Sequence, residues 1–395
     1  MGRWALTTSV VGLFEKAPPR YKPLTKRVPG MRIHFVLPGL HRVQRGAEVA
    51  FESVAQELGL LGEDVMLVGS GRERSGRAYR FQHVPAIGRE WFERLPKFPL
   101  LRSEYMYEEL TFVAGLAFRY RRDDADLTVT CSYPYTNWFL RTFIPGRRRP
   151  AHIFVTQNGD WPAYRREREF RFFSCEGLVC TNPLYFERNR DRWRSTLMPN
   201  GVDTDRFRPG PSDRSAFGLP ADRAVVLMVS ALTEGKRVLQ GMKAVSRLHD
   251  PFLVIAGDGP LRADVDRLAE QILPARFLRG TFPHEQMPDL YRCADVLLHP
   301  ALFESFGNVY VEALSTGLPV VANDISLTRW IFDGHGHLVD ATSEEALASA
   351  LKSILAGART GTLERAAFAA ARYSWRSVAR LYQSFFREVA ERSRL

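Results

Sequence analysis

The chain has 395 residues, of which 45% are hydrophobic and 25% are charged. These values are close to those of an average globular protein, so they exclude a disordered chain, a fibrous protein and a polytopic membrane protein, and the length predicts two domains. Lys and Arg outnumber Asp and Glu by 55 to 44, and the resulting net charge of +11 predicts an anionic partner, which is a nucleotide, a nucleic acid or an acidic membrane surface.

Residues 1–30 are predicted to form a basic flexible arm. They mix Lys, Arg and Pro without the continuous apolar region of a signal peptide, and no stretch of the chain is long and apolar enough for a transmembrane helix. The sequence therefore predicts a cytoplasmic protein, with peripheral attachment to the inner face of the membrane as an option. The cysteines match no zinc or redox spacing and are predicted to be buried free thiols: Cys131, Cys175, Cys180 and Cys293.

A first series of short apolar runs alternates with helical patterns, which predicts a parallel sheet covered by helices. The predicted strands are residues 32–37, 64–69, 79–84, 127–131, 151–156, 177–181 and 196–198. They define a first Rossmann-like domain over residues 31–205.

A second series follows a proline-rich break at Pro209, Pro211 and Pro220. Its predicted strands are residues 224–230, 252–256, 276–278, 295–299, 319–322 and 337–339, and its clearest helices are residues 236–248, 261–271 and 308–316. This second Rossmann-like domain spans residues 206–374, and residues 375–395 are predicted to be an amphipathic helix that packs back on the first domain. The predicted fold class is therefore α/β, with two doubly wound domains facing a cleft where ligands bind at the carboxyl ends of strands.

Two glutamates eight positions apart form the strongest functional signal, with Glu304 on a predicted loop and Glu312 inside a predicted helix. The segment between them holds a small turn and the start of that helix: Phe306, Gly307, Asn308 and Val309. A helix N-terminus offers free N–H groups and a positive dipole end, as a diphosphate requires. Glu312 is then placed to bind ribose hydroxyls and Glu304 a sugar hydroxyl. On spacing alone, a surface acid and a helix-start acid remain open alternatives.

Two further strand-to-helix turns carry candidate ligand-binding residues. Lys236 and Arg237 stand near a predicted helix start, where a bound phosphate would compensate their unfavourable interaction with the helix dipole. Gly257 and Gly259 lie in an Ala-Gly-Asp-Gly-Pro turn and allow a close approach of the backbone. Solvation of the two cations and an ordinary turn are the corresponding alternatives.

Together these segments resemble glycosyltransferase family 4, which comprises retaining enzymes of the GT-B fold. The resemblance covers roughly residues 31 to 390. It is carried by the Glu-x7-Glu pair with the Gly-x-Pro-Val-Val run after it, and by four shorter segments: Gly46-Ala47-Glu48, Pro199-Asn200-Gly201-Val202-Asp203, Gly257-Asp258-Gly259-Pro260 and Tyr373-Ser374-Trp375.

The resemblance implies a role for each matching residue. The implied catalytic residues are Lys236, Glu304 and Arg237. The implied donor-binding residues are Gly46, Gly257, Gly259, Phe306, Gly307, Asn308, Val309 and Glu312. The implied hinge residues are Asn200, Gly201 and Asp203. Two positions depart from the family: Ala231 stands where a diphosphate-binding Arg is usual, with Arg237 as the candidate replacement, and the segment from Thr156 to Trp161 lacks the usual His.

The resemblance implies a reaction in which a hexosyl group leaves a nucleotide-diphosphate sugar, most often UDP- or GDP-linked, with its anomeric configuration retained by front-face displacement. The acceptor is a glycan, a lipid-linked molecule or a small molecule. No cofactor is expected beyond the nucleotide-sugar co-substrate. No metal ion is expected either, because no Asp-x-Asp pair stands at a strand end in the context expected of a metal site. The alternatives are a catalytically weak sugar-nucleotide-binding relative, a nucleotide-sugar epimerase and a phosphorolytic enzyme.

The basic charge raises two other partner classes, nucleic acids and anionic membranes. A nucleic acid is not predicted, since the aromatic residues are not interleaved with Arg in a recognition pattern. An anionic membrane surface stays open, because the first domain has many aromatic residues, several of them next to Arg. Part of this set is a candidate to rest on an anionic bilayer together with Arg147, Arg148 and Arg149, with packing in the core and helices as the alternative. The aromatic residues are Trp91, Phe92, Trp138, Phe139, Trp161, Tyr164, Phe170, Phe172 and Phe173.

Overall fold

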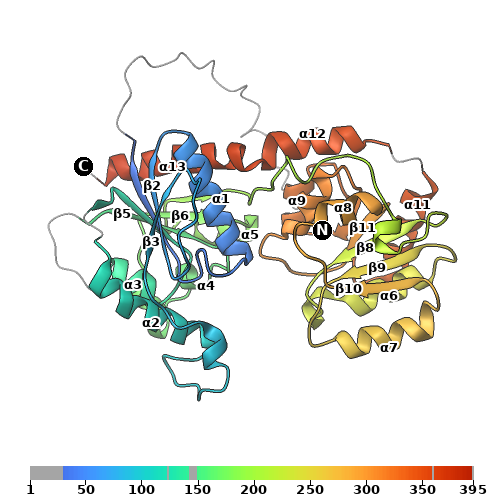
Figure 1. Cartoon of the computed structure of the whole chain (residues 1–395), viewed down its shortest axis with the longest axis horizontal. Helices are drawn as coiled ribbons and strands as arrows, with labels where there is room; N and C mark the ends of the chain where they lie inside the picture. The colour runs from blue at the N-terminus through green and yellow to red at the C-terminus, as the bar shows by residue number, and fades with distance from the viewer. Residues whose placement is uncertain (1–29, 122–123, 142–148, 358–359, 394–395) are drawn as a thin grey trace, which may run out of the picture. The chain divides into compact units, whose positions relative to one another are not determined.

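A computed structural model describes residues 30–121, 124–141, 149–357 and 360–393, and the predicted N-terminal arm lies outside them except for its last residue. From Met31 onward the described residues hold two parallel sheets with helices around them (Figure 1). Among these described helices, none combines the length and the hydropathy needed to cross a bilayer.

The first sheet has the strand order β3-β2-β1-β4-β5-β6-β7, and each neighbouring pair is parallel. Its strands are β1 (Arg32–Val36), β2 (Asp64–Gly69), β3 (Arg80–His83), β4 (Leu127–Thr130), β5 (Ala151–Val155), β6 (Gly177–Cys180) and β7 (Ser195–Leu197). The helices that follow these strands are α1 (Gly46–Leu60), α2 (Glu104–Arg119), α3 (Tyr135–Arg141), α4 (Trp161–Tyr164) and α5 (Pro183–Asn189).

Helices cover both faces of the first sheet, because successive side chains of a strand point to opposite faces. In β1, Ile33 and Phe35 join the core formed with α1 and with α13 (Trp375–Arg392). Val36 packs on the other face against α2 and α3. The predicted return of the C-terminal helix to the first domain is thereby confirmed, and Figure 1 shows α13 beside that sheet.

The second sheet has the order β10-β9-β8-β11-β12-β13 and is also parallel throughout. Its strands are β8 (Val225–Val229), β9 (Phe252–Ala256), β10 (Phe277–Gly280), β11 (Val296–His299), β12 (Val320–Asn323) and β13 (His337–Val339). Its helices are α6 (Val238–Ser246), α7 (Arg262–Ile272), α8 (Met287–Cys293), α9 (Asn308–Ser315), α10 (Ser326–Phe332), α11 (Glu344–Ala356) and α12 (Thr362–Tyr373). One face packs on α8, α9, α10 and α12, and the other on α6, α7 and α11.

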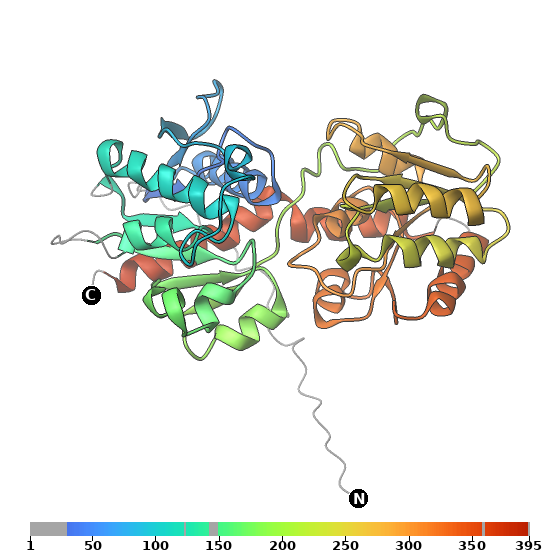
Figure 2. The same cartoon turned by 90° about the horizontal axis from the view of Figure 1, so that it is seen from below.

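Two segments of the chain connect the two sheets, and these segments lie side by side. The N–H of Val202 donates to the carbonyl of Tyr373 at 2.7 Å, so the connection after β7 pairs with the junction of α12 and α13. Gly201 lies against the indole of Trp375, where a Cβ atom would overlap the ring. Figure 2 shows α12 and α13 end to end from below.

All the predicted strands are confirmed, with ends that differ by at most two residues. The helix predicted over residues 236–248 is wrong at its start. Arg237 adopts a left-handed conformation (φ 54°, ψ 37°), which separates a 3-10 turn at Glu234–Lys236 from α6. Lys236 therefore stands before the helix rather than in it. The four cysteines are buried and free, as predicted.

Candidate functional site

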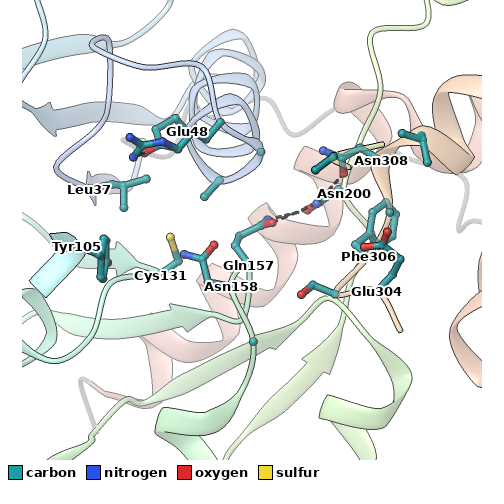
Figure 3. Close-up of a pocket in the computed structure, with 18 of the residues that line it drawn as sticks. Leu37, Glu48, Tyr105, Cys131, Gln157, Asn158, Asn200, Glu304, Phe306 and Asn308 are labelled. Atoms are coloured by element: carbon teal, nitrogen blue, oxygen red, sulfur yellow. Dashed lines mark hydrogen bonds and ion pairs between the residues drawn. The ribbon is translucent and has the colours of Figure 1, made fainter. Parts of the chain in front are cut away.

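A cavity of about 550 Å³ lies where the carboxyl ends of strands from both sheets meet (Figure 3). Wall residues on the first sheet's side include Arg45, Gly46, Glu48, Arg89, Tyr105, Cys131, Gln157, Asn158 and Asn200. Wall residues on the second sheet's side include Ser230, Ala231, Lys236, His299, Glu304, Phe306, Gly307, Asn308 and Val309. Loops, strand ends and helix starts from both sides thus surround one ligand-sized space, as expected for doubly wound folds.

A cluster of three polar side chains forms the centre of the second sheet's wall. Lys236 in the turn after β8 donates from Nζ to Glu304 Oε1, and His299 Nε2 at the end of β11 lies 2.8 Å from the same oxygen. Burial raises the pKa of Glu304, but the hydrogen bonds and positive charges of His299 and Lys236 outweigh it and hold that pKa below its ordinary value. Glu304 is therefore an ionised acceptor at neutral pH.

The N-terminus of α9 lies next to this cluster. Gly307 has φ 84° and ψ 72°, a left-handed conformation that glycine adopts without strain, and the N–H of Tyr310 donates to its carbonyl at 3.0 Å. Asn308 and Val309 precede that bond, so their N–H groups are among those a helix leaves without an internal partner. Together with Lys236 they make this wall of the cavity attractive to an anion.

A chain of amide side chains connects the walls of the cavity. Asn200 and Gln157 exchange hydrogen bonds of 2.6 and 3.1 Å, and Asn200 Nδ2 also donates to Asn308 Oδ1 at 3.1 Å (Figure 3). Asn182 Nδ2 donates to the carbonyl of Glu304 at 3.0 Å. The segment around Gln157, which lacks the His usual in the family, therefore contributes to the cavity wall, and Gln157 helps to hold Asn200 there.

The other two predicted hinge residues lie outside the cavity. Gly201 packs against Trp375, and Asp203 Oδ1 accepts from the N–H groups of Asp205 and Arg206 at 3.2 and 3.3 Å. Gly46, by contrast, begins α1 within the cavity wall, and a Cβ atom on it would lie 3.6 Å from Asn308 Nδ2. The first turn of α1 and the first turn of α9 thus approach each other across the cavity.

Besides these two hinge residues, four more predicted site residues do not line this cavity. The Arg237 guanidinium donates to the carbonyl of Ala341 at 3.3 Å, away from the position of Ala231 in the wall. Glu312 Oε2 accepts from the hydroxyl of Tyr291 at 2.7 Å, and burial raises the Glu312 pKa.

The remaining two are Gly257 and Gly259, which lie against the backbone of Ser230 and Leu232, where a Cβ atom on either would collide with a carbonyl oxygen. These glycines therefore shape the segment that leads to Lys236, without lining the cavity themselves.

Arg45, Arg89 and Tyr105 are among the wall residues on the first sheet's side that were not predicted as site residues from the sequence. Arg45 directly precedes Gly46, and this basic residue at a helix start is the only signal that could have identified one of them. Arg89 and Tyr105 come from separate elements, and the guanidinium of Arg89 lies 5.2 Å from the centre of the Tyr105 ring. No spacing in the sequence links these two residues to the cavity.

A fully buried carboxyl group, Glu109 of α2, lies behind Tyr105. Its Oε1 accepts from the N–H of Thr136 at 2.8 Å, but burial is the larger effect and raises the pKa of Glu109 to about 7. An unfolded glutamate has a pKa of about 4.3, so between these values the folded state binds more protons and its stability falls as pH rises.

Replacement of Glu109 by glutamine is expected to remove this pH dependence. At pH 8 the variant is expected to exceed the wild type in free energy of unfolding by up to about 3 kcal/mol, and at pH 4 the two are expected to be close. Urea unfolding at both pH values measures this, with Glu104→Gln at the start of the same helix as the control. Equal loss of stability from pH 4 to pH 8 in the wild type and Glu109→Gln would contradict the assignment.

Residues 211–373 match the family of glycosyl transferases group 1. The matched segment holds the whole second sheet, and Lys236, His299 and Glu304 lie within it. This segment of the chain is therefore similar to that family.

Similar proteins extend the comparison beyond the matched segment. The putative glycosyltransferase EpsF of Bacillus subtilis is 31% identical over 192 residues, which are 46% of this chain and 49% of that protein. The GDP-mannose-dependent alpha-(1-6)-phosphatidylinositol monomannoside mannosyltransferase of Mycolicibacterium smegmatis is 35% identical over 182 residues, 41% of this chain and 47% of that protein. The chain spans about half the length of the curated relatives it matches.

The fold has a counterpart among solved structures. The structure of sucrose-phosphate synthase from Thermosynechococcus elongatus superposes with a TM-score of 0.74 and 20% sequence identity. The match covers 92% of this chain and 100% of the synthase chain. The likeness confirms the predicted GT-B fold.

Proposed function

Because residues 211–373 match the family of glycosyl transferases group 1, we propose that the chain is a retaining glycosyltransferase. It moves a hexosyl group from a nucleotide-diphosphate sugar, UDP- or GDP-linked, to a glycan, lipid-linked or small-molecule acceptor. In this proposal residues 31–205 bind the acceptor, residues 206–374 bind the donor, and residues 375–395 return to the acceptor domain.

The observation that carries the proposal is the position of Lys236 and Glu304 beside the start of α9 within one cavity. The amides of Asn308 and Val309 and the ammonium group of Lys236 are suited to a diphosphate, and the ionised Glu304 is suited to a sugar hydroxyl. A nucleotide-sugar contains both groups in one molecule.

In the proposed reaction the bond between the anomeric carbon and the diphosphate oxygen breaks while an acceptor hydroxyl bonds to that carbon on the same face. The hydroxyl proton passes to the leaving phosphate oxygen, so the protein supplies no nucleophile. Lys236 and the α9 amides stabilise the charge that grows on the diphosphate, and Asn200 holds Asn308 in place. The scheme assigns charge stabilisation to these groups and requires neither a metal ion nor a further cofactor.

Ala231 in the cavity wall favours a second candidate function. An alanine there leaves the second sheet's wall with Lys236 as its cation, and Lys236 is already paired with Glu304. A protein with this arrangement would bind a nucleotide-sugar and transfer the sugar slowly. The rate at which nucleoside diphosphate is released from the donor in the presence of acceptor distinguishes an efficient enzyme from such a binding relative.

Donor binding is expected to raise the melting temperature selectively for one nucleotide class. The purified protein is screened by thermal shift against UDP-, GDP-, ADP- and TDP-sugars, because a ligand at 100 times its Kd stabilises the native state by about 2.7 kcal/mol. Gly46→Leu is expected to abolish the shift, since the new side chain fills the space between α1 and α9.

Gln44→Leu is the matched control, because Gln44 is exposed two residues earlier and does not line the cavity. It is expected to keep the full shift. The proposed donor site is refuted if no nucleotide-sugar shifts the wild type, or if Gly46→Leu responds as the control does.

A further inference from the structure

The segment between β3 and α2 exposes an unusual number of apolar side chains. Trp91 is 83% exposed and Phe98 is 53% exposed, and every residue from 93 to 100 is exposed. We call residues 87–102 the apolar excursion. Its exposed large apolar residues are Ile87, Trp91, Leu95, Phe98 and Leu100.

The backbone of the apolar excursion is held in place although its side chains are exposed. Phe98 and Leu101 exchange backbone hydrogen bonds of 3.2 and 2.9 Å, which closes a tight turn. The Tyr107 hydroxyl of α2 donates to the carbonyl of Pro96 at 2.5 Å, and the Tyr135 hydroxyl of α3 donates to the carbonyl of Leu100. The apolar side chains are therefore presented in a fixed arrangement.

Cations are interleaved with these apolar side chains. Arg94 and Lys97 are both exposed, and the Lys97 ammonium lies 3.6 Å from Glu104 in an ion pair open to solvent. An exposed ion pair of this kind contributes little free energy, so the Lys97 ammonium group remains available to another anion. A short run that alternates Trp, Leu and Phe with Arg and Lys is suited to the interface of an anionic bilayer.

Both ends of the apolar excursion lead to the cavity. Arg89 near its start and Tyr105 just after its end line the cavity wall and contact each other. A surface on which the excursion rests therefore lies close to the first sheet's side of the cavity, which the proposed function assigns to the acceptor.

We propose that the apolar excursion inserts into the surface of an anionic lipid bilayer and that the acceptor is a lipid-linked molecule delivered from it. The second half of this proposal rests on the proposed function, whereas the first half does not. A protein partner is disfavoured, because a stable protein interface takes about 20–30 residues on each side and the excursion is a single short projection. A bilayer needs only the immersion of the projecting side chains.

Of the aromatic residues that the sequence indicated, Trp91 belongs to the apolar excursion, whereas others do not contribute to this surface. Phe139, Phe170 and Phe173 are buried in the core. Arg147 and Arg148 lie outside the described residues. The sequence pattern did not separate buried from exposed aromatic residues, and burial makes that distinction.

The test is co-sedimentation of the full chain, without donor, with vesicles of phosphatidylcholine alone and of phosphatidylcholine mixed with phosphatidylglycerol. Binding is expected only to the mixed vesicles and is expected to weaken with salt. The double variant Trp91→Ala/Phe98→Ala is expected to lower partitioning about tenfold or more, and Arg94→Glu/Lys97→Glu is expected to abolish the preference for phosphatidylglycerol.

Leu363→Ala in α12 is the matched control, since Leu363 is 76% exposed and lies in the half of the chain that carries the second sheet. It is expected to bind vesicles as the wild type does. All variants are expected to keep the wild-type melting temperature and donor-induced shift, which separates failure of this proposal from failure of the proposed function.

Three outcomes would overturn bilayer insertion. These are absence of vesicle binding by the wild type, equal binding to both vesicle types, and unchanged binding by the Trp91/Phe98 double variant. Self-association that the double variant loses, in a chain that ignores vesicles, would identify a second copy of the chain as the occupant instead. If vesicles bind as expected but the protein transfers sugar only to water-soluble acceptors, the lipid-linked acceptor is rejected and the membrane surface stands.

Discussion

Replacement of Lys236 by alanine is expected to lower the kcat of sugar transfer by about 10²–10³-fold, because loss of one preorganised donor to a developing anion costs about 2.7–4 kcal/mol in the transition state. The KM for the donor is expected to rise less, since charge grows on the diphosphate as the bond breaks. Steady-state kinetics with the donor found by thermal shift measure both constants.

Lys243→Ala provides the matched control for this experiment. Lys243 belongs to α6, lies 3.9 Å from Glu344 in an exposed ion pair and does not line the cavity. Its loss is expected to leave kcat unchanged. A Lys236→Ala enzyme with a near wild-type kcat would remove Lys236 from the machinery and would shift attention to Arg45 and Arg89 in the opposite wall.

Truncation of Phe386 to alanine is expected to lower the free energy of unfolding by about 3–5 kcal/mol. Phe386 of α13 is completely buried, and its ring centre lies 6.1 Å from that of Phe35 in β1 and 5.5 Å from that of Tyr382. The cavity left by the ring therefore opens in the core of the first sheet, although Phe386 follows the second sheet in sequence.

Urea unfolding measures this loss, and hydrogen exchange locates it. Leu381 on the same helix is 43% exposed, so Leu381→Ala is expected to change stability by less than about 0.5 kcal/mol. Faster exchange is expected in β1 and β2, with little change in β8 and β9. Destabilisation confined to the second sheet would contradict the assignment of α13 to the first.

The strands were predictable because buried parallel strands are short, nearly continuous apolar runs such as Val225–Val229. The start of α6 was not predictable, because Arg237 adopts a left-handed conformation. A residue with a Cβ atom rarely adopts this conformation, so the sequence does not indicate it. The predicted continuous helix from residue 236 failed for this reason alone.

In the second sheet's part of the site, Glu304, Phe306, Gly307, Asn308 and Val309 were predictable because they are close together in the chain, whereas His299 was not predicted. Residues that the fold brings together from distant elements were not predictable in the same way. Arg89 and Tyr105 have no shared motif, and the sequence places them sixteen positions apart in a segment without a pattern.

The role of Glu312 also depended on a partner invisible to motif analysis. Tyr291 of α8, twenty-one positions away, donates a hydrogen bond from its hydroxyl to the Glu312 carboxylate. Similarly, the two glycines of the β9–α7 turn are explained by the backbone of Ser230 and Leu232 that passes against them. In each case a neighbour that is distant in the sequence explains why the residue is there.

The packing of α13 on the first sheet has a consequence for synthesis of the protein. During translation, strands β1 to β7 emerge long before Phe385, Phe386 and Val389, which complete their core. Domains generally fold as they emerge, but here the whole second sheet must be made first. The nascent first sheet therefore spends that interval with the part of its apolar face that α13 later covers still exposed.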